Sequence, residues 1–376
     1  MKRKPKIAIL ANYPAWLHCE DIPRSVGHYE VWHAAMHEAL RISDSYEIHR
    51  IILNKQVKRR IDFQDEGAYF HVLPAARQLI GLHTAYIWDR YHVAKCLREI
   101  EPDLLHAWGT EYCYGLCAMD FKGKKLFSLQ GHLTAYAQRA KIAPFEQKQS
   151  RYEARVFRSM PVMTTESEWA RDRILEMAPK ADVRLWDYAV ENRFFQAERK
   201  IEEAPSCLLA STNAPVKNVA LAVRAFSRPE LRHIKLYMAG IRADIYPALP
   251  PNIIPLGQVP RDEIVTLLSK TWAVVHPSLA DSCPNIIKET RVVGLPAIIT
   301  HDCGAKQYVA HEKSGFITRP NNEQEFVDAV LHVTQSKEIS LNMGQYDQQR
   351  CREALSQQTM FKKISNLYDE ILSSPS

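Results

Sequence analysis

Short runs of apolar, mostly β-branched residues alternate with amphipathic stretches along nearly the whole of this 376-residue chain. Such runs are typical of buried strands, and the stretches between them have the spacing of helices that cover a sheet. A chain that repeats strand and helix in this way can form few architectures, because the helices must cross over between parallel strands. The sequence therefore predicts an α/β fold built on parallel sheets.

The predicted strands fall into two sets, with a charged, proline-containing segment between them. The first set is Lys6–Asn12, Tyr46–Leu53, Tyr69–Leu73, Leu104–His106, Lys125–Leu129, Val162–Thr165 and Val183–Asp187. The second set is Ser206–Ala210, Ile234–Ala239, Ile253–Leu256, Ala273–His276 and Ala297–Thr300. Helical spacing is found at Ser25–Ile42, Thr84–Ile100, Glu338–Leu355 and Met360–Leu372. Segment Glu191–Pro205 is the predicted linker, and two such halves place a ligand in the cleft between the carboxyl ends of their strands.

The composition is that of a globular protein and excludes several other classes. Hydrophobic residues make up 46% and charged residues 24%, while 13 Gly and 21 Pro exclude collagen and wholesale disorder. The longest apolar runs, such as Ile7–Ala11, are far shorter than the roughly 20 residues that span a bilayer. That run is also too short for the apolar core of a signal peptide. We therefore expect a cytoplasmic protein.

The positive charge is confined to the first half of the chain. Residues 1–200 hold 31 Lys and Arg against 25 Asp and Glu, whereas the remaining residues hold 18 of each. The excess lies in Lys2, Arg3, Lys4 and Lys6, in Lys55, Lys58, Arg59 and Arg60, and in Lys122, Lys124 and Lys125. Such clusters attract phosphate, in an anionic membrane leaflet, a lipid pyrophosphate or a nucleic acid. A solvated basic face is the alternative, and charge alone does not choose among these.

The stretch HPSLADSCPNIIKETRVVGLPAIIT, from His276 to Thr300, is the most informative part of the sequence. It begins in a predicted strand and continues into a predicted helix, Asn285–Val293. Pro284 suits the first turn of this helix, and Ser282 or Cys283 would then stand in the capping position.

The start of this helix is a predicted phosphate site. The amides of Asn285 and Ile286 lack intrahelical partners and lie at the positive end of the helix dipole, facing the cleft. Asp281 lies just before the helix, and Glu289 lies about five residues into it. Carboxylates accept hydrogen bonds from sugar hydroxyls, so that one would serve a sugar beyond the phosphates and the other a ribose behind them. This suits a nucleotide diphosphate sugar; a solvated loop Asp and an exposed helix Glu are the alternative.

The same stretch resembles the D/E-x7-E signature of the retaining, family 4 glycosyltransferases with the GT-B fold (glycosyl transferases group 1). The family variant is E-G-S-P-N-x-x-K-E-A, followed by a G-x-P strand. The matching residues are Asp281, Ser282, Pro284, Asn285, Lys288, Glu289, Gly294 and Pro296. Asp281 stands where the family usually has Glu.

Two further stretches of the second half resemble the same family. Ser211–Asn218, with the sequence STNAPVKN, looks like the loop that ends in Lys, which makes Lys217 the residue whose ammonium binds the donor phosphates. Ser211 stands where many members have Arg. Met238–Gly240 and Leu256–Val259 resemble the family's strand ends that shape the nucleotide pocket. The resemblance therefore adds Gly240 and Val259 to the donor site.

The first half carries weaker motifs of the same family in the same order. Leu104–Glu111 resembles the family's HxxG strand end, which puts His106 and Glu111 on the acceptor side. Ser128–His132 resembles the next strand end, where the histidine, here His132, reaches the transferred sugar. Gly27 stands where the family has a Gly pair that lets phosphate approach the backbone.

The resemblance implies a GT-B fold, with two Rossmann-like β/α/β domains that face each other across a cleft. Residues 1–190 would bind the acceptor, residues 200–355 would bind the donor, and residues 356–376 would form a helix that packs back on the first domain. The implied reaction moves a sugar, with retention, from a nucleotide diphosphate sugar to a cell-surface glycan or lipid-linked acceptor of polysaccharide, capsule or lipopolysaccharide type. No metal or other cofactor is implied, and a peripheral contact with the inner membrane face is expected.

The resemblance also assigns roles to single residues. Lys217 and the helix start would stabilise the departing diphosphate, while Asp281 and His132 would hold the sugar. The implied catalytic residues are therefore Asp281, His132 and Lys217. The implied donor-binding residues are Gly27, Ser211, Lys217, Gly240, Val259, Ser282, Asn285, Ile286 and Glu289, the last of which holds the ribose.

Missing motifs exclude other enzyme classes, but two alternatives stay open. The sequence has no D-x-D metal-diphosphate motif, no G-x-G-x-x-G, no G-x-x-x-x-G-K-[ST] and no G-x-S-x-G. One alternative is a glycosyltransferase that modifies nucleic acid, since the first half is basic. The other is a degenerate, non-catalytic binding subunit, which the departures at Ser211 and Asp281 motivate.

Overall fold

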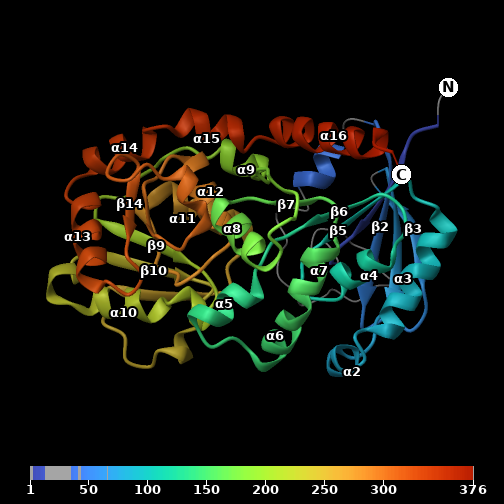
Figure 1. Ribbon diagram of the computed structural model, residues 1–376. Helices are drawn as coiled ribbons and strands as arrows, with labels where there is room; N and C mark the ends of the chain where they lie inside the picture. Colours follow the sequence, from blue (N-terminus) through green and yellow to red (C-terminus); the bar gives the residue numbers. More distant parts are fainter. Residues whose placement is uncertain (1–2, 13–34, 41–43, 66, 376) are drawn as a thin grey trace. The chain divides into compact units, whose positions relative to one another are not determined.

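The computed structural model describes residues 3–12, 35–40, 44–65 and 67–375. The chain divides into two compact units (Figure 1). Unit 1 comprises Met1–Thr134, Ala143–Ala189 and Gln357–Ser376, and unit 2 comprises Ala135–Ile142 and Val190–Ser356.

Unit 1 is built on an eight-stranded sheet with the order β3-β4-β2-β1-β5-β6-β7-β8. Strand β3 runs antiparallel to β4, and the other neighbouring pairs are parallel. The strands are β1 (Lys6–Leu10), β2 (Glu47–Asn54), β3 (Ile61–Asp65), β4 (Ala68–Pro74), β5 (Leu104–Trp108), β6 (Lys125–Ser128), β7 (Met163–Thr165) and β8 (Val183–Leu185).

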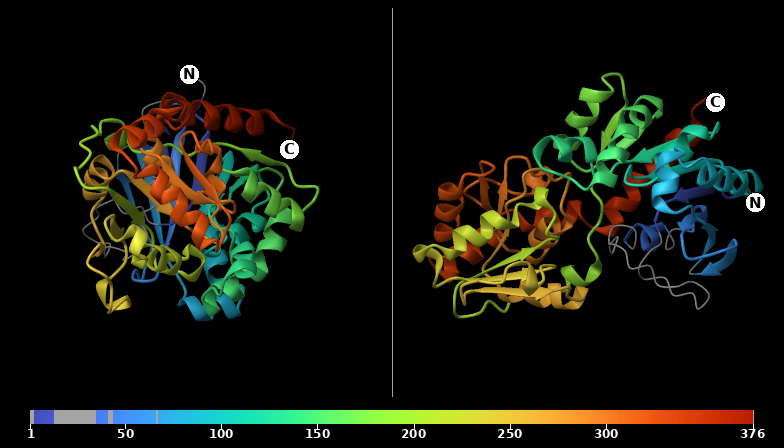
Figure 2. Two further views of the ribbon diagram at one scale, coloured as in Figure 1. Left: turned by 90° about the vertical axis from the view of Figure 1, so that its left-hand side faces the viewer. Right: turned by 90° about the horizontal axis from the view of Figure 1, so that it is seen from below.

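Helices cover both faces of this sheet (Figures 1 and 2). The helices are α2 (Gln78–His83), α3 (Ile87–Ile100), α4 (Tyr114–Asp120), α5 (Leu133–Arg139), α6 (Pro144–Gln149), α7 (Glu153–Ser159), α8 (Glu168–Met177) and α16 (Gln357–Ser373), with a 3-10 turn at Ser150–Tyr152. Residues 35–40 are also helical and pack with α16 on one face, whereas α3, α4, α7 and α8 pack on the other. Helix α5 begins in unit 1 and ends in unit 2.

The last helix, α16, completes the core of unit 1. Its Met360, Ile364 and Tyr368 are fully buried with the apolar residues of β1, β2, β4 and β5. The hydroxyl group of Tyr368 lies 2.7 Å from Nδ1 of His106, and Nε2 of this ring lies 2.7 Å from Oγ of Ser128. The predicted return of the last helix to the first domain is confirmed.

Unit 2 is built on a parallel six-stranded sheet with the order β11-β10-β9-β12-β13-β14. The strands are β9 (Ser206–Ala210), β10 (Lys235–Ala239), β11 (Ile253–Gly257), β12 (Ala273–His276), β13 (Ala297–Thr300) and β14 (Gly315–Thr318). The helices are α9 (Asn192–Phe195), α10 (Val219–Ser227), α11 (Arg261–Lys270), α12 (Asn285–Val293), α13 (Glu323–Val333), α14 (Lys337–Gln345) and α15 (Gln348–Ala354). Short 3-10 turns lie at Pro215–Lys217, Pro229–Leu231, Ala243–Ile245 and Gly304–Tyr308. Apolar clusters fill both faces of this sheet as well.

All the predicted strands are present, and two further strands, β3 and β14, were not predicted. Strand β3 alternates half-buried and exposed residues at the edge of its sheet, and β14 is a short strand that begins at Gly315, whose φ is 147°. The predicted helix Glu338–Leu355 is two helices, α14 and α15, because Asp347 adopts a left-handed conformation with φ of 59° between them. Of the predicted helix Ser25–Ile42, the structure describes residues 35–40.

Helix α12 has the predicted bounds but a different amino-terminal cap. Its N-cap residue is Pro284 itself, not Ser282 or Cys283, and no side chain of the described residues caps it. The helix ends at Gly294, whose φ of 94° favours glycine, and a Cβ atom there would lie 2.7 Å from the side chain of Gln348.

A buried arginine fixes the other end of α12. The guanidinium of Arg291 is fully buried and donates hydrogen bonds to the carbonyl oxygens of Leu295, Tyr308, Gly344 and Tyr346. Burial lowers the pKa of Arg291 from its ordinary value, because these neutral carbonyl acceptors do not balance the buried charge. Arg291 therefore ties α12 to the segments before β13, before β14 and between α14 and α15.

We expect Arg291→Met to lower the free energy of unfolding of unit 2 by about 3–5 kcal/mol, because the change leaves buried carbonyl oxygens without donors. Urea unfolding followed by circular dichroism measures this. Arg224→Met is the matched control, since Arg224 is half exposed and its ion pair with Glu323 lies on the surface, where it contributes about 0–1 kcal/mol. Equal losses for the two variants would contradict the role given to Arg291.

Candidate functional site

Polar and small residues gather at the carboxyl edge of the six-stranded sheet. Ser211 follows β9, Gly240 follows β10, and His276 ends β12. The parallel register pairs Ala210 with Ala239, so these strand ends lie side by side. Loops at the carboxyl edge of a parallel sheet are the usual place for a ligand in α/β proteins.

Gly240 allows the backbone after β10 to approach the backbone after β9 closely. Its φ is 86°, and a Cβ atom there would lie 2.2 Å from the carbonyl oxygen of Ser211, so that no other residue fits without movement. The amide of Ser211 donates to the carbonyl oxygen of Ala239 (3.0 Å). The hydroxyl of Ser211 is buried and has no hydrogen-bond partner among the described residues, and the same holds for the hydroxyl of Ser278, which follows β12. Two buried hydroxyl groups at this edge are thus available to a polar ligand.

Asp281 is the centre of the charged groups at this edge. Its Oδ2 atom lies 2.5 Å from Nζ of Lys217 and 2.8 Å from Nε2 of His276. Asp281 is buried, and its Oδ1 atom accepts no hydrogen bond from the described residues. The amide of Leu279 donates to the carbonyl oxygen of Val216 (2.7 Å), which holds the two loops together.

Asp281 is fully ionised at neutral pH. Burial alone raises the pKa of this carboxyl group, but the charge of Lys217 and the hydrogen bond from His276 outweigh burial and lower the pKa to about 2. An ionised carboxylate with one oxygen to spare is a strong acceptor for a ligand hydroxyl.

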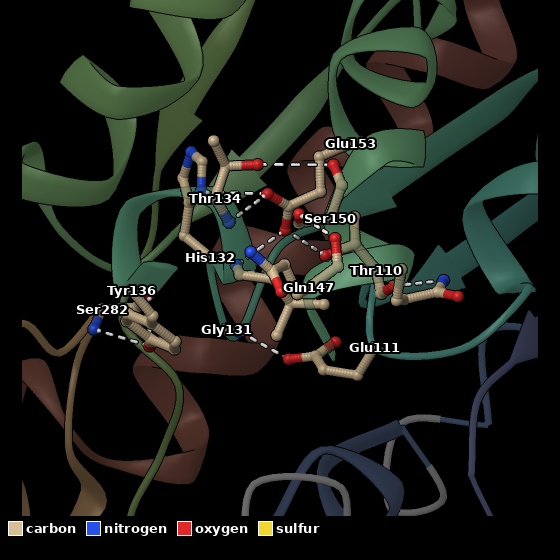
Figure 3. Close-up of polar contacts among 12 residues, drawn as sticks. Thr110, Glu111, Gly131, His132, Thr134, Tyr136, Gln147, Ser150, Glu153 and Ser282 are labelled. Carbon is tan, nitrogen blue, oxygen red and sulfur yellow. Dashed lines mark hydrogen bonds and ion pairs between the residues drawn. The ribbon is translucent and has the colours of Figure 1, made fainter. Parts of the chain in front are cut away.

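The segment before α12 is held by a tyrosine. Figure 3 shows the hydroxyl group of Tyr136, on α5, beside Ser282: it accepts the amide N–H of Ser282 (3.1 Å) and lies 3.0 Å from Oγ of that residue. Asn285 and Ile286 then open the helix, whose first amides have no intrahelical acceptor. The helix start is a place where an anion binds well.

Glu289 lies inside α12 and shares an arginine with a second carboxylate. The guanidinium of Arg261, at the start of α11, lies 2.6 Å from Oε1 of Glu289 and 2.9 Å from Oε1 of Glu191. Glu289 is 2% exposed, and its Oε2 atom accepts no hydrogen bond from the described residues. The two carboxylates raise the pKa of Arg261 despite its burial.

In unit 1, His132 is oriented by a buried glutamate. Nδ1 of His132 lies 3.2 Å from the carboxylate of Glu153, which also accepts the hydroxyl of Thr110 (2.6 Å) and the amides of Leu133 and Thr134 (2.8 Å each) (Figure 3). Burial raises the pKa of Glu153, but the hydrogen bonds and the charge of His132 hold the pKa below its ordinary value. The carboxylate therefore fixes the ring of His132.

The other predicted residues are placed as follows. Glu111 is exposed and accepts the amide of Gly131 (2.8 Å), beside His132 in the chain. His106 differs from expectation: its ring lies inside the core of unit 1 between Tyr368 and Ser128 and does not line a surface. Burial lowers its pKa well below the ordinary value. Val259 packs against the apolar core after β11, and Gly27 lies outside the described residues.

Much of the basic excess has partners within the chain. Arg3 pairs with Asp103, Lys4 pairs with Asp44, and Lys124 and Lys125 donate to backbone carbonyl oxygens. Arg60 pairs with Asp62 and Glu99, so it does not share the exposed charge expected of its cluster. Lys55, Lys58 and Arg59 remain exposed.

Sequence reasoning did not assign a role to His276, Arg261, Glu153 or Tyr136. The sequence did carry a signal for His276, which ends a predicted strand and lies five positions before Asp281. The other three are joined to their partners only by the fold, since Arg261 and Glu289 are 28 positions apart and Tyr136 and Ser282 are 146 apart. No spacing rule links such residues.

Among the described residues, none of the helices combines the length and the apolar character that a membrane span requires.

Comparison with known proteins identifies the second unit and the fold. Residues 190–350 match the family described as Glycosyl transferases group 1. A stretch of 81 residues is 31% identical to the UDP-Gal:alpha-D-GlcNAc-diphosphoundecaprenol alpha-1,3-galactosyltransferase of Escherichia coli. That match covers 22% of this chain and 21% of the relative, so it spans about a fifth of the curated protein.

Two solved structures resemble the chain over nearly its whole length. The sucrose-phosphate synthase of Thermosynechococcus elongatus has a TM-score of 0.80 at 13% identity, with 99% of this chain and 100% of that chain covered. The Anabaena protein HepE, solved in complex with UDP and glucose, has a TM-score of 0.70 at 13% identity, with 97% and 100% covered. Residues 190–350 thus match the glycosyl transferases group 1, and the two α/β units of the chain have the GT-B fold.

Proposed function

We propose that this protein is a retaining glycosyltransferase that moves a sugar from a nucleotide diphosphate sugar to a lipid-linked or cell-surface glycan acceptor in polysaccharide biosynthesis. The observation that carries the proposal is the cluster of Lys217, Asp281 and His276 at the carboxyl edge of the unit 2 sheet, beside the start of α12. Together these loops provide the ammonium group of Lys217, the anion-binding amides at the start of α12 and the ionised carboxylate of Asp281. HepE was solved with UDP and glucose, which supports a nucleotide sugar as the donor.

The donor diphosphate would be held by Lys217 and the first amides of α12. Breaking the bond between sugar and phosphate adds negative charge to the leaving diphosphate, which a fixed ammonium group and helix dipole stabilise. Asp281 holds the ammonium group in place through Oδ2 and presents Oδ1 to a hydroxyl of the sugar. The hydroxyl groups of Ser211 and Ser278 would complete the cradle.

The nucleoside and the acceptor would use the remaining groups. Glu289 would accept the ribose hydroxyls through Oε2 while Arg261 holds Oε1. In unit 1, His132 would contact the transferred sugar, with Glu153 as its positioning residue, and Glu111 would lie on the acceptor side. In the retaining reaction proposed here, an oxygen of the departing diphosphate takes the proton of the acceptor hydroxyl, so the protein mainly orients the reactants.

The lipid-linked acceptor has one piece of support from the comparisons. The name of the Escherichia coli relative describes transfer of galactose to a GlcNAc-diphosphoundecaprenol. An acceptor that carries a diphosphate and a lipid fits the basic character of the first half of this chain.

We expect Lys217→Ala to lower the rate of sugar transfer about 100- to 1,000-fold, because a cation is lost from a leaving group that gains charge. Turnover is measured against a panel of UDP-, GDP-, TDP- and ADP-sugars after a thermal-shift screen for the donor. Lys200→Ala, at an exposed position of the same unit, is the control and should leave turnover unchanged. Wild-type activity in Lys217→Ala would refute the assignment, and donor binding by a wild type without turnover would favour a non-catalytic binding subunit.

Glu289→Gln should weaken donor binding about five- to tenfold, because a neutral amide accepts ribose hydroxyls less strongly than a carboxylate does. Calorimetric titration with the donor found in the screen measures the change. Glu191→Gln is the matched control: it removes the same charge from Arg261 but leaves Oε2 of Glu289 unchanged. An effect confined to acceptor affinity, or an equal effect in both variants, would contradict the ribose contact.

Transfer should survive treatment with EDTA. In this proposal Lys217 and the amides of α12 provide the positive potential that a metal ion provides in other glycosyltransferases. Initial rates are compared before and after chelation and desalting. Complete loss of activity that Mn²⁺ or Mg²⁺ restores would show that the diphosphate is held differently.

A further inference from the structure

Five large apolar side chains are exposed on two neighbouring helices of unit 1. The exposed fractions are 66% for Ile87, 63% for Leu79, 60% for Tyr91, 58% for Ile80 and 44% for Trp88. Helices α2 and α3, which carry these residues, contact each other. A single exposed apolar residue is ordinary, but a group of this size marks an interaction surface. We call these five residues the α2–α3 surface.

The backbone keeps this surface in a fixed shape. Ala85 and Tyr86, between the two helices, both adopt left-handed conformations, with φ of 49° and 54°. Tyr86 is fully buried, its amide donates to the carbonyl oxygen of Gly81 (2.7 Å), and its hydroxyl donates to Oε1 of Gln149 (2.9 Å). The turn is thus anchored by an inward tyrosine, and Ile87 and Trp88 directly after it point outward.

The exposed charges on and beside α2 and α3 are mostly basic. Of the acidic residues on α3, Asp89 is fully buried, where it accepts the amide of Ala76 (2.9 Å) and the hydroxyl of Tyr112 (3.2 Å), whereas Glu99 is exposed and pairs with Arg60. Arg77 and Lys95 are exposed. With Arg98 also exposed, basic residues outnumber the acidic Glu99 on these helices, which favours an anionic partner.

The basic loop that the sequence singled out lies next to this surface. Strands β2 and β4 are paired, with Asn54 opposite Pro74, and the amide of Ala75 donates to the carbonyl oxygen of Asn54 (3.1 Å). The loop after β2, which carries exposed Lys58 and Arg59, and the segment that leads from β4 into α2 therefore leave the sheet at the same edge.

We propose that the α2–α3 surface docks on an anionic lipid bilayer. Leucine, isoleucine, tryptophan and tyrosine side chains enter the boundary between headgroups and acyl chains, while Lys58, Arg59 and Arg77 contact the lipid phosphates. The surface lies at the carboxyl edge of the unit 1 sheet, the edge at which Glu111 and His132 follow β5 and β6. This deepens the proposed function and rests on it for the lipid-linked acceptor, which a docked bilayer would present to unit 1.

Flotation of the full chain with vesicles tests the proposal without any transfer reaction. We expect the protein to bind vesicles of phosphatidylglycerol and phosphatidylcholine, to bind pure phosphatidylcholine more weakly, and to lose affinity as salt rises. Ile87→Ser combined with Trp88→Ser should weaken binding about tenfold or more, because two apolar side chains no longer leave water. Lys58→Ser combined with Arg59→Ser should remove most of the salt dependence.

Leu185→Ser combined with Lys180→Ser is the matched control, since both residues are exposed in unit 1 but lie at the other end of its sheet order, on β8 and before it. The control should bind vesicles like the wild type, and melting temperatures should agree among all variants. Equal binding of anionic and neutral vesicles, or normal binding by Ile87→Ser/Trp88→Ser, would overturn the proposal. So would a wild-type dimer that this double variant converts to monomers, or a preference for duplex DNA at physiological salt. Failure of sugar transfer with intact vesicle binding would refute the proposed function and leave the docking surface in place.

Discussion

The contacts of the buried Asp281 carboxylate with the ammonium group of Lys217 and the ring of His276 govern the arrangement of unit 2 at the carboxyl edge of its sheet. A buried carboxylate is tolerated only when opposite charges and hydrogen bonds replace its lost water. Lys217 comes from the loop after β9 and His276 from the end of β12, and both meet the same oxygen atom. The need to compensate the charge of Asp281 therefore fixes the loop after β9 and the end of β12. It also holds the ammonium group of Lys217 at the edge where a phosphate would bind.

Helix α12 likewise serves both the stability of unit 2 and the proposed site. In the proposed site this helix contributes its first amides and Glu289, while its far end is fixed by Arg291, which donates hydrogen bonds to four backbone carbonyl oxygens. A helix that is anchored at one end by a network of hydrogen bonds can offer unsatisfied amides at the other without fraying. The stability of unit 2 and the chemistry of its edge thus depend on one element, so changes far from the ligand are expected to be felt at the site.

The sequence was sufficient where a pattern is local and insufficient where a contact is made by the fold. Buried parallel strands appear as apolar runs, and the bounds of α12 follow from its composition. Strand β3 was missed because its residues alternate at a sheet edge, and Ser282 was misjudged as a cap because nothing local shows that its amide and hydroxyl meet Tyr136. His106 sits in a motif that implied an acceptor contact, yet burial against Tyr368, 262 positions away, gives it a role in the core.

The return of α16 to unit 1 has a consequence for the order in which the protein is made. Unit 1 is discontinuous: its sheet is synthesised first, but the face that packs against Met360, Ile364 and Tyr368 stays uncovered until the whole of unit 2 has left the ribosome. Unit 2 is continuous from Val190 to Ser356 apart from the short segment of α5, so it can fold while unit 1 waits. The domain that is translated first is therefore expected to be the last to mature, and during that interval its open apolar face is the part of the nascent chain that most needs a chaperone.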